Sequence, residues 1–278
     1  EASKQLGGRV IAESNLKGLA IWRRVSDYRI YQLQQMDNVN IYLDSALDVQ
    51  QVLELGIEQV FVATGAIWRK DGIGRTSRKP IAGLEQVAVY TPDDVMSGVP
   101  LGQGPVVIYD DDQGYLGGVL ADHLSDLGHD VLFVTSASIV SPFTELTLEQ
   151  EQIQRGLVAQ GVGIYTNKII VSVSQKSGHA GVELKCVYGG QDEWLACASL
   201  VLVTERESAS PLYEQLQQWQ KDDGTSMAMS VTLIGDALAP GLIADAVFSG
   251  HQAAQEFEAD PDIIEQGLFK REMPSLNS

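Results

Sequence analysis

The sequence has few cysteines and histidines and no long hydrophobic run. Its two cysteines, Cys186 and Cys197, cannot supply the four thiolates of an iron–sulfur cluster, and its four histidines show no metal-ligand spacing. No apolar run approaches the roughly 20 residues of a membrane span, and no signal peptide is recognisable. We expect a cytoplasmic protein without a metal site, whose cysteines are small buried thiols. In the pattern CVYGGQDEWLAC they could also face each other across two strands.

Positive charge is also scarce. The 278 residues include 37 Asp and Glu against 19 Lys and Arg, which gives a net charge of −18. Such a chain is repelled by nucleic acid and by anionic membranes, so neither is an expected partner. The remaining composition, 44% hydrophobic and 20% charged, is that of a globular protein. Because the first residue is Glu1 and not Met, we expect a fragment or a processed chain.

Strand patterns and helix patterns alternate along the chain. The predicted strands are 38–44, 58–66, 105–110, 129–135, 161–174, 182–190, 193–204 and 230–237. The predicted helices are 20–36, 48–56, 115–127, 147–161 and 241–258. This alternation indicates an α/β protein with two Rossmann-like domains, parallel sheets and an antiparallel meander. The second domain, 99–205, is inserted into a discontinuous first domain made of 1–98 and 206–278.

Two motifs of the predicted first domain combine acidic residues with glycines. Glu1 lies six residues before the pair Gly7 and Gly8. In a dinucleotide-binding fold an acid at a strand end accepts hydrogen bonds from ribose hydroxyls, and glycines let the backbone approach the pyrophosphate. The second motif, Gly235 and Asp236, follows a strand and precedes a helix, where the carboxylate can accept from a ribityl hydroxyl and the helix N-terminus can face a phosphate. The alternatives are a charged terminus before a turn and a simple helix cap.

A third motif, Thr64 and Gly65, is a turn at the end of a buried strand. It would line the same nucleotide, or it is only a left-handed turn. No residue of the chain is nominated as a catalytic acid, base or nucleophile.

The stretch VVIYDDDQGYLGG (106–118) is close to a second dinucleotide-binding turn. Gly114 and Gly117 have the required spacing, but Asp112 stands where the first glycine belongs, after Asp110 and Asp111. A carboxylate ~4 Å from a phosphate charge costs on the order of 4 kcal/mol at an effective dielectric constant near 20. A helix N-terminus offers only ~0.3–1 kcal/mol, up to ~2 in favourable geometry.

We therefore expect this second site to keep the fold but to have lost NAD(P)H binding. Three alternatives stay open. The aspartates could cap the following helix, hold a divalent ion between them, or turn to solvent beside a surviving NAD(P)H site.

The order of these motifs resembles one family. ATGAIW (63–68) and IGDALAPGLIADAVFSGH (234–251) are its most specific stretches. The chain is similar to the C-terminal half of the iron–sulfur flavoproteins with an Old Yellow Enzyme-like barrel, the NADH:flavin oxidoreductases that include trimethylamine dehydrogenase and 2,4-dienoyl-CoA reductase. The resemblance implies two glutathione reductase-like domains that hold FAD or ADP, and an N-terminal barrel that carries FMN and a 4Fe–4S cluster.

The resemblance also assigns roles and shows two departures. By this resemblance Glu1 would contact the adenosine ribose, and Gly7 and Gly8 would approach the nucleotide. Thr64 and Gly65 would line the nucleotide, and Gly235 and Asp236 would reach toward its far end. The glycine-rich turn that should precede Glu1 is missing, and so is the barrel. We thus expect a chain cut from a longer, homo-oligomeric parent whose barrel is its partner, with an electron-transfer protein as a further partner.

Three functions follow from this resemblance. The first is the nucleotide-binding part of an oxidoreductase that oxidises an amine or an N-methyl compound, and the lost second site favours it. The second is an FAD-dependent NAD(P)H:flavin reductase module, which would need that site. The third is a non-catalytic pair of docking domains.

Overall fold

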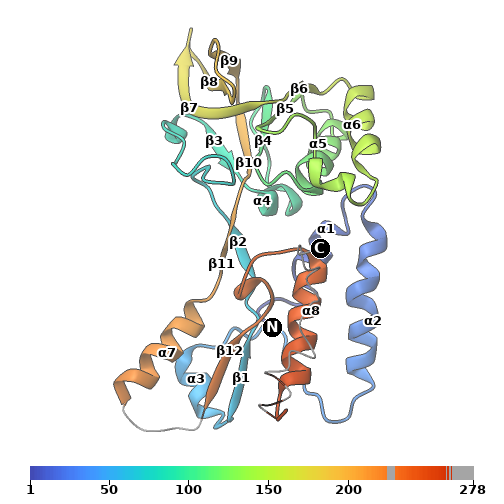
Figure 1. Cartoon of the computed structure of the whole chain (residues 1–278), viewed down its shortest axis with the longest axis vertical. Helices are drawn as coiled ribbons and strands as arrows, with labels where there is room; N and C mark the ends of the chain where they lie inside the picture. Colours follow the sequence, from blue (N-terminus) through green and yellow to red (C-terminus); the bar gives the residue numbers. More distant parts are fainter. Residues whose placement is uncertain (224–228, 261, 263, 265–278) are drawn as a thin grey trace, which may run out of the picture. The chain divides into compact units, whose positions relative to one another are not determined.

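The computed structural model describes residues 1–223, 229–260, 262 and 264, and it separates into two units (Figure 1). Unit 1 contains residues 1–2, 44–67 and 207–278, and unit 2 contains residues 3–43 and 68–206. The predicted class, α/β with parallel sheets and an antiparallel meander, is confirmed. No helix in the described part of the chain is long and apolar enough to cross a membrane.

Unit 2 is built on a five-stranded parallel sheet. Its strands, in spatial order, are β3 (Ala88–Tyr90), β10 (Ser199–Val203), β4 (Val106–Asp110), β5 (Val131–Thr135) and β6 (Gly163–Tyr165). The central strands β10 and β4 are buried along their whole length, as their continuous apolar sequences SLVLV and VVIYD predict. Alternate residues face opposite sides, so Ile108 packs against the helices and Val107 against the meander.

Helices cover one face of this sheet. They are α4 (Pro92–Met96), α5 (Tyr115–Asp126) and α6 (Gln150–Ala159), with the shorter turns η2 (Leu84–Gln86) and η3 (Pro142–Glu145) nearby in sequence. The helix α5 buries Leu116, Leu120 and Leu124, whose spacing of four places them on one helical face.

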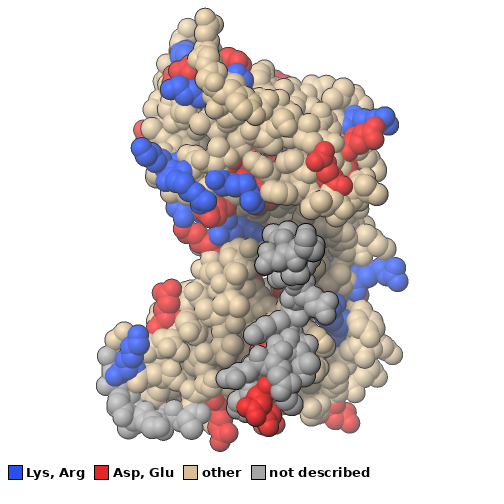
Figure 2. Space-filling model, viewed as in Figure 1, with Lys and Arg blue, Asp and Glu red and all other residues tan. Residues whose placement is uncertain are grey.

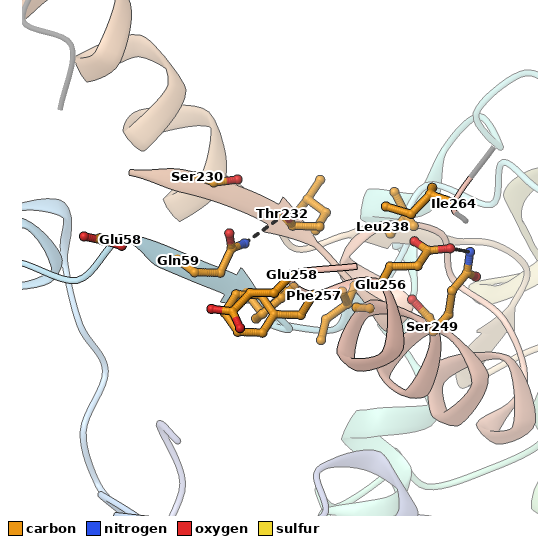
Figure 3. A pocket seen from close by; sticks show the side chains of 15 residues that line it. Glu58, Gln59, Ser230, Thr232, Leu238, Ser249, Glu256, Phe257, Glu258 and Ile264 are labelled. Carbon is orange, nitrogen blue, oxygen red and sulfur yellow. Dashed lines mark hydrogen bonds between the residues drawn. The ribbon is translucent and has the colours of Figure 1, made fainter. Parts of the chain in front are cut away.

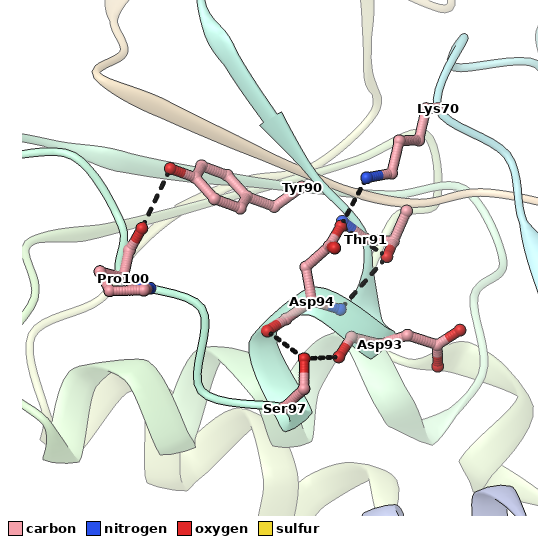
Figure 4. Close-up of polar contacts among 7 residues, drawn as sticks. All are labelled: Lys70, Tyr90, Thr91, Asp93, Asp94, Ser97 and Pro100. Carbon is pink, nitrogen blue, oxygen red and sulfur yellow. Dashed lines mark hydrogen bonds and ion pairs between the residues drawn. The ribbon is translucent and has the colours of Figure 1, made fainter. Parts of the chain in front are cut away.

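The short helix α4 is fixed at both ends by side chains (Figure 4). The Thr91 hydroxyl accepts from the Asp94 amide at 3.3 Å, and the Asp94 carboxylate accepts from the Thr91 amide at 2.8 Å, which is a capping box. Lys70 pairs with the same carboxylate at 2.9 Å. At the other end, the Ser97 hydroxyl donates to the Asp93 carbonyl at 2.7 Å.

The meander covers the other face. Its strands are β7 (Lys168–Lys176), β8 (His179–Cys186) and β9 (Glu193–Ala196), paired antiparallel in that order. The prediction of one strand over 161–174 was wrong, because the chain turns at Asn167 with φ +55° and divides it between β6 and β7. Both cysteines are free thiols, and burial raises the pKa of Cys197 to about 12.

The first helices of the chain belong to unit 2. They are α1 (Arg9–Glu13), η1 (Ala20–Trp22) and α2 (Arg23–Gln34). Leu16 and Leu19, and also Trp68 and Val95 further along, join the core of Ile108 and the α5 leucines. The structure therefore groups residues 3–43 and 68–98 with the second unit, whereas the sequence pattern assigned them to the first domain.

Unit 1 contains a two-stranded parallel sheet of β1 (Gln59–Val62) and β12 (Ser230–Leu233). On one face of it lie α3 (Val49–Glu54) and α7 (Pro211–Asp223), whose Val52 and Leu216 are buried beside Met229. The turn η4 (Gly235–Ala237) and the helix α8 (Ile243–Glu256) follow β12. The chain passes between the units in β2 (Ala66–Trp68) and β11 (Arg206–Ser208), which pair with each other.

Candidate nucleotide sites

In unit 1 two of the predicted motifs lie at the same edge of the sheet. Because β1 and β12 are parallel, Thr64 and Gly65 after β1 stand beside Gly235 and Asp236 after β12. The two turns are tied together by a hydrogen bond from the Ile234 amide to the Val62 carbonyl, at 3.0 Å. Glu1 belongs to the same unit and is exposed, and its carbonyl accepts from the Ser45 amide at 3.0 Å.

The two glycines of this edge are required by the backbone. Gly65 has φ +80° and Gly235 has φ +59°, a region that side chains disfavour. A Cβ on Gly65 would meet no atom within 4 Å, so the backbone there is open. The Thr64 hydroxyl donates to the Ala209 carbonyl, and the Ala209 amide donates to the Gly65 carbonyl at 2.9 Å. Thr64 thus holds the returning chain in place.

Asp236 acts within its own turn. Its Oδ1 accepts from the Gly241 amide at 3.0 Å, ahead of α8, and Asp245 accepts from the Leu242 amide at 2.9 Å. The Gly235 amide donates to the hydroxyl of Ser249 in α8, at 2.9 Å. These contacts support the capping alternative for Asp236, and its contact with a nucleotide stays a prediction.

Gly7 and Gly8 belong to unit 2, whereas Glu1, Thr64, Gly65, Gly235 and Asp236 belong to unit 1. Their carbonyls accept from the Val10 and Ile11 amides, both at 3.1 Å, as α1 begins. Gly7 has φ +115°, and a Cβ there would come within 2.8 Å of the Ile11 side chain. The pair therefore has a structural role at the start of α1.

In unit 2 the acidic turn follows β4, and its first residue is buried completely. Asp110 Oδ1 accepts from the Gln113 amide at 2.9 Å, while Oδ2 has no hydrogen-bond partner among the described residues. A Cβ on Gly117 would lie 2.7 Å from Asp110 Cγ, so this carboxyl fills the space beside the first turn of α5. Burial, with the charges of Asp112 and Asp111, raises the pKa of Asp110 well above its usual value.

Asp111 is fully buried as well and binds two other loops. It accepts from the Thr76 amide at 2.7 Å and from the Ser136 hydroxyl at 2.8 Å. Ser136 in turn accepts from the Gln113 side chain at 2.9 Å. The backbone of Gly74 lies so close that a Cβ there would be 2.6 Å from the Asp111 carboxylate. Loop 72–78 therefore lies against the turn where a coenzyme would bind.

Asp112, the residue in the first glycine position, is partly buried. Burial raises its pKa, while the charges of Arg75 and Arg9 and a hydrogen bond from the Gly114 amide oppose the shift. Gly114 begins α5 without a side-chain cap. Asp110 and Asp112 accept hydrogen bonds from amides just before α5, as the capping alternative requires. The carboxyls of Asp110 and Asp111 are buried and therefore do not turn to solvent. No cluster suited to a metal ion occurs in the described residues.

A third buried carboxylate in unit 2 was missed by the sequence reasoning. Glu13, with 0% exposure, pairs with Arg9 Nε at 2.9 Å and accepts from the Tyr115 hydroxyl at 2.6 Å. Trp22 packs edge-on against Tyr115, with ring centroids 4.8 Å apart. The spacing of four between Arg9 and Glu13 was the only signal for this contact. Residues 9–22 thus pack on the first turn of α5.

The comparison with protein families places this turn and the parallel sheet around it. Residues 90–204 match the OYE-like second alpha/beta domain. This match covers the acidic turn, α5 and the meander, and it agrees with the resemblance to the Old Yellow Enzyme-like flavoproteins. The matched residues lie within unit 2.

The whole chain is similar to amine-oxidising enzymes. It is 31% identical to dimethylamine dehydrogenase of Hyphomicrobium sp. (strain x), over 98% of this chain and 40% of that protein. The structure of histamine dehydrogenase from Rhizobium sp. 4-9 matches 94% of this chain and 40% of its own, with 40% identity and a TM-score of 0.88. The structure of 6-hydroxypseudooxynicotine amine oxidase from Pseudomonas geniculata N1 matches 93% of this chain and 38% of its own, with 38% identity and a TM-score of 0.86. The chain thus spans about two fifths of these relatives.

Proposed function

We propose that this chain is the nucleotide-binding C-terminal part of an oxidoreductase of the trimethylamine dehydrogenase type, whose parent oxidises an amine or an N-methyl compound. The similarity to dimethylamine dehydrogenase over 98% of the chain carries this proposal. Two solved relatives at 40% and 38% identity also bear names of amine-oxidising enzymes. The similarity to a 2-naphthoyl-CoA reductase, at 19% identity, supports the fold alone.

The geometry of unit 2 supports the amine-oxidising branch over a NAD(P)H:flavin reductase. The first turn of α5, which would face a coenzyme diphosphate, is filled by the Asp110 carboxyl, and loop 72–78 is bound to Asp111. The segment after β5, residues 136–149, contains Glu145 and Glu149 and no Lys or Arg that could bind the 2′-phosphate of NADPH. A diphosphate there would meet carboxyl groups in place of backbone amides.

The parent is proposed to hold FMN and a 4Fe–4S cluster in a barrel outside this chain, and FAD or ADP in unit 1. When bound, the FMN would supply the two-electron chemistry of amine oxidation. The residues of unit 1 fit the sugar part of a nucleotide, since the exposed Glu1 offers a carboxylate and the open backbone at Gly65 allows close approach. The described residues of unit 1 contain no glycine-rich phosphate turn, so the diphosphate needs a further element.

The same proposal includes the partners. This chain would contact the barrel of the same polypeptide. The parent would be a cytoplasmic homo-oligomer that also contacts an electron-transfer protein. The barrel is supported by one observation, that the chain spans only 40% of the dimethylamine dehydrogenase that it matches.

Anaerobic titration of the full-length protein tests the proposal. Dimethylamine, histamine, NADH and NADPH are added separately, and flavin absorbance is followed. We expect an amine to bleach the flavin and both coenzymes to leave it oxidised. Rapid bleaching by NADH or NADPH would reject the amine assignment in favour of the reductase. Mass spectrometry of the cofactors released from the same protein decides between FAD and ADP.

A further inference from the structure

Each unit contains an aromatic pair that packs edge to face. In unit 1 the ring centroids of Phe61 and Phe257 lie 6.1 Å apart, on an open groove of about 650 Å³ beside α8 (Figure 3). In unit 2 those of Trp22 and Tyr115 lie 4.8 Å apart. A phenyl ring has no proton to release, whereas Tyr115 carries a phenol hydroxyl and Trp22 an indole N–H. The pair in unit 2 therefore has a chemistry that the pair in unit 1 lacks.

The Tyr115 hydroxyl is bound to a buried base. It donates to Glu13 Oε2 at 2.6 Å, and Arg9 Nε lies 2.9 Å from Oε1 of the same carboxylate. Of the charged side chains in the described part of the chain, only Glu13, Asp110 and Asp111 are buried, whereas those coloured in Figure 2 lie at the surface. A hydrogen bond to a carboxylate is strong, and proton transfer needs just such a short distance. Glu13 is therefore a fixed proton acceptor for Tyr115.

Tyr109 in β4 is a matched tyrosine without such a base. It is fully buried, and in the described part of the chain no carboxylate accepts from its hydroxyl. Burial raises the pKa of both phenols, and the charge of Asp111 adds to the shift at Tyr109, as that of Glu13 does at Tyr115. Both phenols thus keep their protons in the resting protein. A phenol that loses an electron becomes a strong acid, and of the two only Tyr115 has a carboxylate to take the proton.

Trp22 gives the electron of Tyr115 a way to the surface. Its side chain is half-buried, so it contacts solvent on one side and the core of unit 2 on the other. Rings in edge-to-face contact can exchange an electron directly, whereas a proton moves only along a hydrogen bond. The two particles can therefore leave Tyr115 in different directions, the electron through Trp22 and the proton to Glu13.

We propose that Tyr115, Trp22 and Glu13 form a redox-active site that gives one electron to an oxidant at the surface of unit 2. The oxidant is an oxygen-centred radical, a class that arises from peroxide where dioxygen meets reduced flavin. Trp22 loses one electron to this radical, which takes a proton from water. Tyr115 then returns one electron to Trp22 and passes its proton to Glu13. The products are a neutral tyrosyl radical and a neutral Glu13 carboxyl.

The site is restored by the reverse transfer. A thiolate in solution gives one electron to the tyrosyl radical and becomes a thiyl radical, and the proton returns from Glu13 to the Tyr115 oxygen. Oxidising equivalents would thus be removed before they reach other side chains of the core. The inference goes beyond the proposed function and shares one part of it, that the parent contains flavin.

Freeze-quench electron paramagnetic resonance of the full-length protein, with its cofactors oxidised, tests the site. Ruthenium tris-bipyridine and persulfate, under a light pulse, remove electrons from aromatic residues at the surface. We expect a tyrosyl signal that falls at least fivefold in Tyr115→Phe. The matched variant Tyr109→Phe removes a buried hydroxyl without a base and should leave the signal unchanged. An unchanged signal in Tyr115→Phe would overturn the proposal.

The proton acceptor is tested in two ways. Glu13→Gln keeps the size of the side chain and removes the base, so the tyrosyl signal should fall at least tenfold while a tryptophan radical accumulates. In the natural protein, which needs no folding control, the tyrosyl signal should form at least twofold more slowly in D₂O than in H₂O. Equal rates in the two solvents, or a full tyrosyl signal in a Glu13→Gln protein with unchanged circular dichroism, would reject Glu13 as the acceptor and with it the proposal.

The electron route is tested with two tryptophans of unit 2. Trp22→Phe should slow formation of the tyrosyl signal at least tenfold. The control Trp194→Phe, in the meander, should leave the rate unchanged. Equal effects of the two changes would contradict the route through Trp22. Reduction of the flavin by NADH in a protein that still forms the Tyr115 radical would reject the amine function and leave this inference standing.

Discussion

Asp110 provides the sharpest test of the acidic turn. Its carboxyl is fully buried, its Oδ2 has no hydrogen-bond partner in the described part of the chain, and burial raises its pKa well above the ordinary value. The folded protein therefore keeps a proton that the unfolded chain releases near pH 4. Since the folded state binds more protons above that pH, stability falls as pH rises towards the folded-state pKa.

The size of the pH dependence is set by the single proton that the folded state holds on Asp110 and the unfolded chain releases. Within that window the free energy of unfolding of unit 2 should fall by about 1.4 kcal/mol per pH unit on account of Asp110. Asp110→Asn keeps the acceptor for the Gln113 amide and removes the titration. The variant should therefore gain about 1.4 kcal/mol relative to the natural chain for each pH unit between the unfolded-state pKa and the folded-state pKa of Asp110.

Urea unfolding at several pH values, followed by tryptophan fluorescence, measures this difference, since three of the four tryptophans lie in unit 2. Asp37→Asn removes the same formal charge from an exposed turn, and its curve is the reference from which the slope is taken. Parallel curves for Asp110→Asn and the reference at every pH above the ordinary carboxyl pKa would refute the buried, protonated carboxyl. The pH at which the difference levels off reports the folded-state pKa.

Three further changes probe the same unit. Asp111→Ala leaves two buried donors without their acceptor and should cost about 1–3 kcal/mol, with faster amide exchange in loop 72–78; unchanged exchange there would argue against the contact. Tyr115→Phe removes the hydroxyl that donates to buried Glu13 and should cost about 1.5–3 kcal/mol in urea unfolding, whereas a neutral result would mean that water replaces it. Cys186 should react with a thiol reagent at pH 8 well before Cys197, whose pKa is raised to about 12; equal rates would contradict the burial.

Patterns of neighbouring residues in the sequence predicted most of the helices and strands of this chain. The spacing of Leu116, Leu120 and Leu124 predicted α5, and the buried runs predicted β4 and β10, because these signals depend only on neighbouring residues. The same spacing predicted a helix over 20–36, but it could not tell which unit that helix joins. This choice depends on contacts between distant residues, such as Tyr115 with Glu13.

The acidic turn shows the same limit at the level of a site. The sequence identified Asp112 as the residue that replaces a glycine, and the expected conflict was repulsion of a phosphate. In the structure the side chains of Asp110 and Asp111 are buried while Asp112 is partly exposed, so we infer that the proposed obstacle to a coenzyme lies with the first two. A strand pattern that ends in three aspartates cannot reveal which of them turn inward, since loop 72–78 and Ser136 supply the donors. An ionised carboxylate repels a ligand that can still enter, and salt screens that repulsion. A buried carboxyl occupies the volume itself, so neutralising Asp112 alone would not restore a coenzyme site.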